Sequence, residues 1–440
     1  MSNSIKTDSY TQQLLRLMAP LIAGNILQQL YNTIDVAVIA RCSGQADFAA
    51  VGVAGSVMNL FLFIVAGACS GLAIVLAQLY GADQWERFRQ AHFLSLTFGL
   101  ALTAMLTLAG LLSLRGIFSL IRTPSELIIP AEQYLRCVLL ALPATYLYNL
   151  YGGMFRSTGH AALPMLILAA ATALNFALDI WFIAGMKMGA HGAALATAIT
   201  QVFSALASLA WLCLKARGCV FRRENCRMDA GLLGKLGHYA FVTGFHQCGL
   251  YVGKLLVQGA VNTGGAALVM AFTAAVRLEG FANSFGDSGS VAASIVTARH
   301  YGAGEKACLP AIFRSTLRLM GTIGITMAAV MFVFAEPLLR LVMGAPDPYA
   351  LSQAVRYLRV ISAFYLFCYT GGAFVGYFDG IGRVTVSMAG AVGHITLRVI
   401  LSWLLVGHFQ LTAIAIATGI GWMIANITWI LIYRTQEKCL

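Results

Sequence analysis

The chain has 440 residues, of which 59% are hydrophobic and only 10% are charged, with a formal net charge of +12. Soluble domains carry about 25% charged residues, so this composition excludes an ordinary soluble enzyme or binding domain. On a membrane protein an excess of Lys and Arg marks the cytoplasmic loops, and we expect no nucleic-acid partner.

Apolar runs, each long enough to cross a bilayer as a helix, recur along the whole chain. With the N-terminus inside the cell, basic residues in the cytoplasmic segments outnumber those outside by about two to one. This bias predicts that both termini are cytoplasmic. The runs predict an all-α polytopic protein of about twelve transmembrane helices, at residues 14–40, 48–79, 91–114, 127–154, 161–184, 190–214, 233–262, 266–298, 311–336, 350–378, 384–406 and 411–433.

The two halves of the chain resemble each other at an offset of about 221–223 residues. Leu79-Tyr-Gly-Ala matches His300-Tyr-Gly-Ala, and Tyr134-Leu-Arg matches Tyr357-Leu-Arg. Phe155-Arg-Ser-Thr-Gly likewise matches Phe378-Asp-Gly-Ile-Gly. Parallel repeats of this kind form two lobes with substrate bound between them. We expect an N-terminal lobe at 1–217, a cytoplasmic loop at 218–232 and a C-terminal lobe at 233–440.

Two aspartates lie inside apolar runs of the first half. Asp35 is the only acid of the first run, and Asp179 lies four residues after Asn175, on the same helix face. An acid at this depth costs about 2.5–3.5 kcal/mol on insertion scales, so it normally faces a bundle interior and has a function. This pattern predicts an ion-coupled transporter. The alternative is a pair of interhelical hydrogen bonds that holds the lobe together.

Several stretches resemble the multidrug and toxic compound extrusion (MATE) family, in its prokaryotic branch, and the resemblance covers the whole chain. They are Pro20 to Asp35, the Tyr-Gly-Ala loop after the second helix, Phe155 to Gly159, Asn175 to Asp179 and Gly192 to Thr197. The resemblance implies a V-shaped pair of six-helix lobes in the bacterial cytoplasmic membrane, with export by alternating access driven by H+ or Na+. It also implies a coupling-cation site at Asp35, Asn175, Asp179 and Thr197.

Helical rise puts Asp35, Asp179 and Thr197 in the outer half of the membrane, so one pocket can hold them. Ionising both carboxylates in that setting has a high free-energy cost, so they need a shared proton or a bound cation. Pro20 matches the family's hinge, although a static kink explains it equally well. Gln28, Tyr31 and Asn32 resemble cavity-lining positions, although neutral helix contacts would also account for them.

The second half differs from the first half at the positions that match the two polar residues Asn175 and Asp179. Aligning the repeats puts His394 opposite Asn175 and Arg398 opposite Asp179, so the duplicated site has lost its acid. Some family members carry an acid where this chain has Gln247. By helical rise, Lys254, Arg277, Glu279 and Arg398 share one depth. Two interpretations stay open: an ion-pair network with Glu279 or Asp287, or a basic wall that recognises an anionic or zwitterionic substrate group.

The expected function is a secondary active antiporter that exports small organic compounds, often cationic, in exchange for H+ or Na+. We expect a monomer with no cofactor beyond the coupling ion, no metal except Na+ at that site, and no enzymatic activity. The rivals are a flippase for lipid-linked substrates of the same superfamily and a membrane-embedded enzyme. The short loops disfavour the enzyme, and the sequence has no Walker, GxSxG or HExxH motif.

Overall fold

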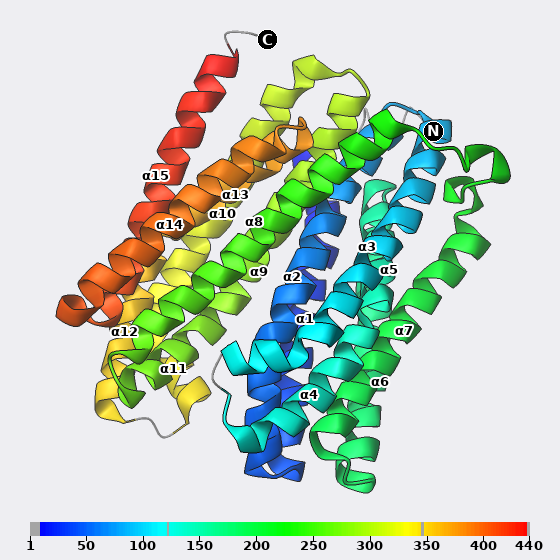
Figure 1. Cartoon of the computed structure of the whole chain (residues 1–440). Coiled ribbons are helices and arrows are strands. Elements are labelled where there is room, and N and C mark those ends of the chain that lie inside the picture. Colours follow the sequence, from blue (N-terminus) through cyan, green and yellow to red (C-terminus); the bar gives the residue numbers. More distant parts are fainter. Residues whose placement is uncertain (1–8, 121–122, 345–346, 438–440) are drawn as a thin grey trace. The chain divides into compact units, whose positions relative to one another are not determined.

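The computed structural model describes residues 9–120, 123–344 and 347–437. These residues are helical almost throughout, and no strand occurs among them (Figure 1). The helices of the first half are α1 (Tyr10–Cys42), α2 (Gln45–Gly81), α3 (Trp85–Leu120), α4 (Ser125–Leu140), α5 (Leu142–Ser157), α6 (Ala162–Asp179), the π-helix η1 (Ile180–Gly185) and α7 (Gly189–Lys215). The connection between the halves holds the short 3-10 helices η2 (Arg217–Cys219) and η3 (Arg223–Asn225).

The second half repeats this order. Its elements are α8 (Ala230–Asn262), α9 (Ala266–Gly302), the 3-10 helix η4 (Lys306–Cys308), α10 (Leu309–Val333), α11 (Ala335–Met343), α12 (Pro348–Ser362), α13 (Tyr365–Gly380), α14 (Val384–Phe409) and α15 (Leu411–Glu437). Among the described residues, eight helices are long and apolar enough to cross a membrane, and two bent pairs raise this to 10. α1 and α8, at 33 residues each, are also long enough to span.

Both bent pairs fall inside predicted single spans, and the sequence reasoning did not anticipate either bend. α4 and α5 meet at 44°, and α12 and α13 at 50°. In the first pair Pro143 has no N–H to give to the carbonyl of Leu139. The hydroxyl of Thr107 on α3 donates to that carbonyl at 3.1 Å instead. The neighbouring helix therefore satisfies the group that the break exposes.

The chain divides into two compact units. Unit 1 comprises Met1–Ile22 and Cys248–Leu440, and unit 2 comprises Ala23–Gln247. The predicted division at 218–232 follows the connectivity of the chain. The compact units instead change within α1 and α8, so the first turns of α1 group with the second half and the first turns of α8 group with the first half.

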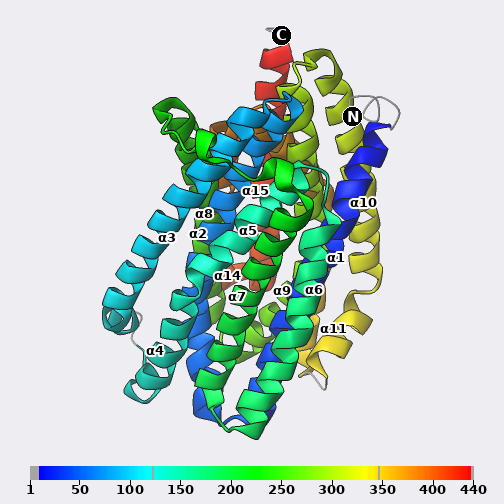
Figure 2. The ribbon, with the colours of Figure 1, turned by 90° about the vertical axis from the view of Figure 1, so that its right-hand side faces the viewer.

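Unit 2 is built around α2, which packs against α3, α4, α5 and α7. A Cβ atom on Gly67 of α2 would lie 2.7 Å from the backbone oxygen of Thr243 on α8. The Thr243 hydroxyl donates a 2.7 Å hydrogen bond to the Gly67 carbonyl. Small residues at such crossings give membrane helices the close contact that holds them together. Figure 2 shows α6 and α7 of this unit running side by side.

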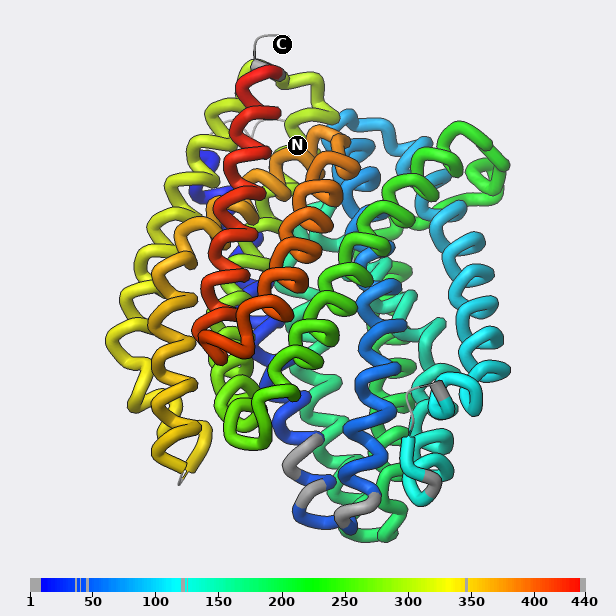
Figure 3. The backbone as a smooth tube through the Cα atoms, turned by 60° about the vertical axis from the view of Figure 1, so that its left-hand side comes forward, coloured from blue at the N-terminus to red at the C-terminus, as the bar shows by residue number. Residues whose placement is uncertain are grey.

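Unit 1 has the same construction. α9 packs against α13, where a Cβ atom on Gly376 would lie 2.6 Å from the Cβ of Ala293. α14 and α15, orange and red in Figure 3, lie side by side. The aromatic rings of Phe313, Phe374 and Tyr433 contact one another where α10, α13 and α15 meet. Close helix crossings at glycine therefore recur in both units.

The internal repeat predicted from the sequence is present in the backbone. After α5, the N–H of His160 donates to the carbonyl of Phe155 at 2.8 Å, and after α13 the N–H of Arg383 donates to Phe378 at 2.8 Å. A glycine with positive φ, +96° in the first turn and +88° in the second, stands in each. The matched sequence segments thus end their helices in the same way.

Candidate functional site

The two intramembrane aspartates of the first half are buried in the interior of unit 2, among a group of side chains that we call the pocket. Asp35 projects from α1, and Asp179 is the last residue of α6. They are 8% and 0% exposed. The two carboxyl groups interact electrostatically. A hydrogen bond between them would need a proton, because an ionised carboxylate only accepts.

The pocket leaves several polar atoms without another partner. Apart from the contact between the two acids, no described residue donates to Asp35 Oδ1 or to either carboxyl oxygen of Asp179. The amide nitrogen of Asn175, one turn earlier on α6, also has no acceptor among the described residues. An uncompensated buried charge costs several kcal/mol, and a proton or a monovalent cation among these oxygens removes that cost. The arrangement can therefore bind H+ or Na+.

The backbone changes its winding directly after Asp179. From Ile180 to Gly185 the helix is of the π type, with a wider turn than α6. The start of α7 packs closely on this segment, since a Cβ atom on Gly192 would lie 3.1 Å from the Cβ of Phe182. π-Turns inside helices occur frequently at functional sites. Here the π-turn sets where the acid and the start of α7 lie.

Thr197 and Tyr31 connect α7 to α1 beside the acids. The Tyr31 hydroxyl lies 3.3 Å from Thr197 Oγ1. Thr197 is 8% exposed, and Tyr31 interacts electrostatically with both Asp35 and Asp179. All four predicted cation-site residues thus lie in unit 2, and Tyr31 joins them.

Tyr134 of α4 is a further member of the pocket that the sequence reasoning did not include. It is 2% exposed and interacts electrostatically with both acids and with Tyr31. Its hydroxyl lies 3.8 Å from the sulfur of Met58. The repeat of Tyr134-Leu-Arg as Tyr357-Leu-Arg was the signal that could have identified it.

The remaining α1 residues are less closely tied to the acids. Gln28 donates to Asn32 Oδ1 at 3.4 Å, and both side chains are exposed. Pro20 lies inside α1, which continues on both sides of it. The division between units 1 and 2 falls between Ile22 and Ala23, two residues after this proline.

Unit 1 contains a second buried acid. Glu279 of α9 is 8% exposed and accepts a 3.2 Å hydrogen bond from the hydroxyl of Tyr357. It also interacts electrostatically with Arg398 and Lys254. The Tyr357 hydroxyl therefore binds this acid within a positive field.

His394 and Lys254 extend this group in unit 1. The His394 ring stacks on Trp422 at 6.1 Å between centroids, one turn before Arg398 on α14. Lys254 is exposed on α8 and interacts electrostatically with Asp287 as well as with Glu279. The predicted cluster around Glu279 therefore contains Arg398 and Lys254.

Two of the residues predicted for this group lie elsewhere. Arg277 is exposed on α9, two residues from Glu279 and so on a different helix face, and it forms no ion pair within the described parts of the chain. Gln247 belongs to unit 2, where its side chain packs against Gly67. Helical rise predicts that Arg277 and Glu279 lie at a similar depth, but depth alone does not determine the direction of a side chain.

Long apolar helices in two repeated sets, with ionisable groups buried among them, define a multi-pass membrane transporter. The sequence profile of the MatE family matches residues 20–181 and 243–404. The chain belongs to this family, the multidrug and toxic compound extrusion transporters.

Relatives and solved structures agree with this assignment. The chain is 27% identical over 331 residues to the probable multidrug resistance protein YoeA of Bacillus subtilis, covering 74% of this chain and 72% of that protein. It is 25% identical over 443 residues to the probable multidrug resistance protein NorM of Thermotoga maritima, covering 98% and 91%. A solved MATE transporter of the MOP superfamily in an outward-facing conformation matches with a TM-score of 0.92 at 23% identity, covering 98% and 97%.

A MOP superfamily transporter of Pyrococcus furiosus also matches, with a TM-score of 0.90 at 23% identity, covering 98% and 96%. The description of that structure attributes to it a reversed polarity of the binding pocket. These likenesses confirm the predicted fold class.

Proposed function

We propose that this protein is a secondary active antiporter of the bacterial cytoplasmic membrane, with both termini in the cytoplasm, that exports small organic compounds by alternating access. The coupling ion, H+ or Na+, binds among Asp35, Asn175, Asp179 and Thr197. The observation that carries this proposal is the buried acid pair: Asp35 Oδ1 and both carboxyl oxygens of Asp179 accept no hydrogen bond from the other described residues. The family of efflux transporters to which the chain belongs supports the direction of transport.

In this mechanism the pair accepts one positive charge from outside and releases it inside. Each elementary charge that crosses the whole membrane potential contributes about 2.3 kcal/mol per 100 mV. With the ion bound, Asp35 on α1 and Asp179 on α6 no longer repel each other, and the two helices can close on the ion. Tyr31 transmits this change to α7 through its contact with Thr197. Loss of the ion restores the repulsion.

Pro20 is the hinge of this proposal. It precedes by two residues the point at which α1 passes from unit 1 to unit 2. A proline leaves one carbonyl of the previous turn without its helical donor, so the helix bends more easily there. A change of charge at Asp35 can then alter the direction of the later part of α1 while the first turns stay with unit 1.

The test uses purified protein in liposomes, with export of cationic and of anionic fluorescent test compounds measured under an imposed pH or Na+ gradient. Asp35→Asn and Asp179→Asn should each abolish gradient-driven transport. Asp83→Asn is the matched control, because this exposed aspartate has φ of +55°, which asparagine tolerates, and asparagine can still accept from Trp85. Transport by both pocket variants at the wild-type rate would refute the coupling site. Replacing the pH gradient by a Na+ gradient identifies the ion.

The charged group of unit 1 supports a proposal about the substrate. Lys254 and Arg398 place a positive field around one buried acid, which suits a substrate with an anionic or zwitterionic group. Such a substrate also includes the lipid-linked compounds that a flippase of the same superfamily carries. Lys254→Glu should shift transport from anionic to cationic test compounds. Unchanged selectivity with normally folded protein would show that the group only stabilises unit 1.

A further inference from the structure

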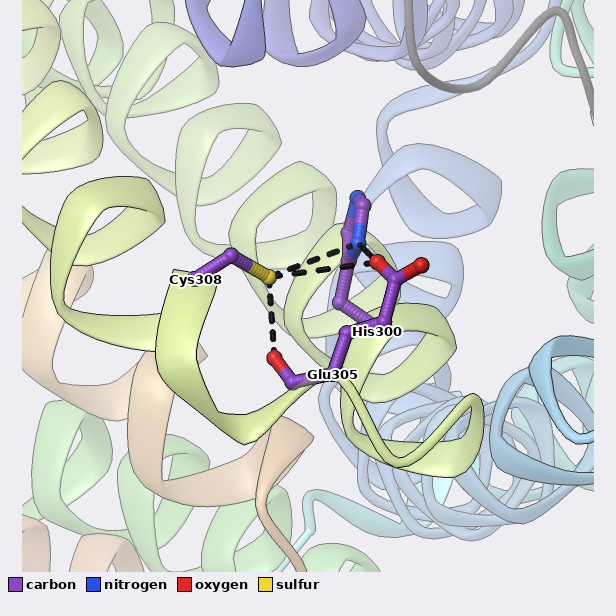
Figure 4. A group of neighbouring side chains, drawn as sticks. All are labelled: His300, Glu305 and Cys308. Carbon is purple, nitrogen blue, oxygen red and sulfur yellow. Dashed lines mark hydrogen bonds and ion pairs between the residues drawn. The ribbon is translucent and has the colours of Figure 1, made fainter.

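Three metal-ligating side chains converge at the turn between α9 and α10, far along the chain from the acid pair. His300 is the last buried residue of α9, Glu305 lies in the turn, and Cys308 directly precedes α10. Figure 4 shows their side chains pointing toward one another. Cys308 Sγ lies 3.6 Å from His300 Nδ1 and 4.0 Å from Glu305 Oε2. All three belong to unit 1.

These spacings are close to those of a metal centre. Zinc binds sulfur at about 2.3 Å and nitrogen or oxygen at about 2.0–2.2 Å in a tetrahedron, so its ligand atoms lie about 3.4–3.6 Å apart. The sulfur-to-nitrogen distance already has this value. The carboxylate oxygen is 2.7 Å from His300 Nδ1, which is too close. It must move by about 0.5–0.7 Å to reach the tetrahedral spacing. Glu305 has an exposed side chain, so a small rotation supplies that movement.

The second nitrogen of His300 is held as it is in metal centres. His300 Nε2 lies 3.2 Å from Gln13 Oε1, a carbonyl oxygen that can only accept, so Nε2 carries the proton. Ligating histidines almost always donate their other N–H in this way, which fixes the ring and directs its lone pair at the metal. Tyr10 packs edge-on against the same ring at 5.7 Å. Both residues come from the start of α1.

The internal repeat shows that the turn does not need these residues. The twin turn after α2 has Leu79, Gln84 and Arg87 at the matching positions. The backbone is nevertheless the same: Gln84 N–H donates to Leu79 O at 3.1 Å, and Glu305 N–H donates to His300 O at 3.0 Å. A turn of the same shape thus closes without histidine, glutamate or cysteine. The three ligand types are specific to the second copy.

We propose that His300, Glu305 and Cys308 bind a divalent cation of the zinc type, with water as the fourth ligand. Thiolate, imidazole and carboxylate together favour zinc over calcium or magnesium, which take oxygen ligands. On binding, the thiol proton of Cys308 and the proton shared by His300 Nδ1 and Glu305 pass to solvent, and the ion takes their place. The bound ion fixes the His300 ring, and through Gln13 and Tyr10 it holds the first turns of α1 against the end of α9.

Cobalt reports on this site directly. The full-length protein in detergent, stripped of metal, is titrated with Co2+ alone and then with Zn2+. Wild type should develop a thiolate-to-cobalt charge-transfer band with the visible bands of a four-coordinate ion, and Zn2+ should remove both. Cys308→Ser should lose the charge-transfer band, and Cys226→Ser, which changes an exposed cysteine of unit 2, should keep it. Gln13→Leu should weaken binding by about 10–100-fold.

A variant with the residues of the twin turn, His300→Leu, Glu305→Gln and Cys308→Arg, removes the site in a turn whose copy folds with them. Zn2+ should slow amide hydrogen exchange at the start of α1 in wild type and leave this variant unchanged. A cobalt spectrum in wild type identical to that of Cys308→Ser would refute the metal site. The cluster would then be only an ion pair between His300 and Glu305 beside the thiol of Cys308. Metal binding without slower hydrogen exchange at the start of α1 would refute the proposal that the ion holds these turns against the end of α9. Neither result depends on transport.

Discussion

Tyr134 and Tyr357 occupy matching positions in the two halves, and the structure predicts different costs for the same substitution at each. Both are almost completely buried. The hydroxyl of Tyr357 donates to Glu279 at 3.2 Å, whereas among the described residues the hydroxyl of Tyr134 donates to the weakly accepting sulfur of Met58, at 3.8 Å. Phenylalanine removes one oxygen from each site and leaves the ring.

Side-chain hydrogen bonds between membrane helices contribute about 0.6 kcal/mol on average and about 1.7 kcal/mol at most. Bonds to charged groups are the stronger ones. Tyr357→Phe also leaves the carboxyl of Glu279 without its donor, so it should cost about 1.5 kcal/mol. Tyr134→Phe should change the free energy of unfolding by less than about 0.5 kcal/mol. The two substitutions are therefore matched controls for each other.

The assay is denaturant unfolding of purified protein in mild detergent, followed by tryptophan fluorescence. A double-mutant cycle separates the role of the acid. With Glu279→Gln in place, Tyr357→Phe should cost only about 0.6 kcal/mol, as for a neutral pair. Equal losses for the two tyrosines, or a loss at Tyr357 that Glu279→Gln does not reduce, would refute the reasoning.

Two further predictions concern packing and orientation. Gly71→Ala places a methyl group against the backbone oxygen of Tyr239 and the hydroxyl of Thr243, so it should separate α2 from the start of α8 and lower the unfolding temperature. Gly55→Ala, which has open space for its methyl group, should leave that temperature within error, and equal effects would contradict the close crossing. Exposed Cys226, in the connection between the halves, should react with an impermeant maleimide only from the cytoplasmic side, whereas buried Cys69 should stay unlabelled. Labelling of Cys226 from outside the cell would reverse the predicted orientation.

The positions of the helices were predictable because the apolar runs are long and polar breaks separate them. Every predicted span corresponds to a helix or bent pair that begins and ends within a few residues of it. The bend at Pro143 depends on Thr107 from another helix, and the bend before Tyr365 has no proline at all. Apolar runs alone contain no signal for either.

The candidate site was predictable in part. Helical rise gave the depth of Asp35 and Asp179, and the structure brings these two acids together. Depth does not give direction, which is why Arg277 was grouped with Glu279 although it lies on another face of α9. A buried tyrosine in an apolar helix resembles ordinary packing, so the sequence does not single out Tyr134. The π-helix after Asp179 has no local sequence signal that we can identify.

The way α1 and α8 change units has a consequence for the origin of the fold. Each half of the gene encodes five complete spans of one bundle together with a helix whose first turns belong to the other bundle. A polypeptide ending near residue 217 would therefore lack the residues that enclose its own α2 at Gly67, because Thr243 and Gln247 come from the second half. Each half of the chain therefore contributes helical turns to the unit that the other half mainly builds.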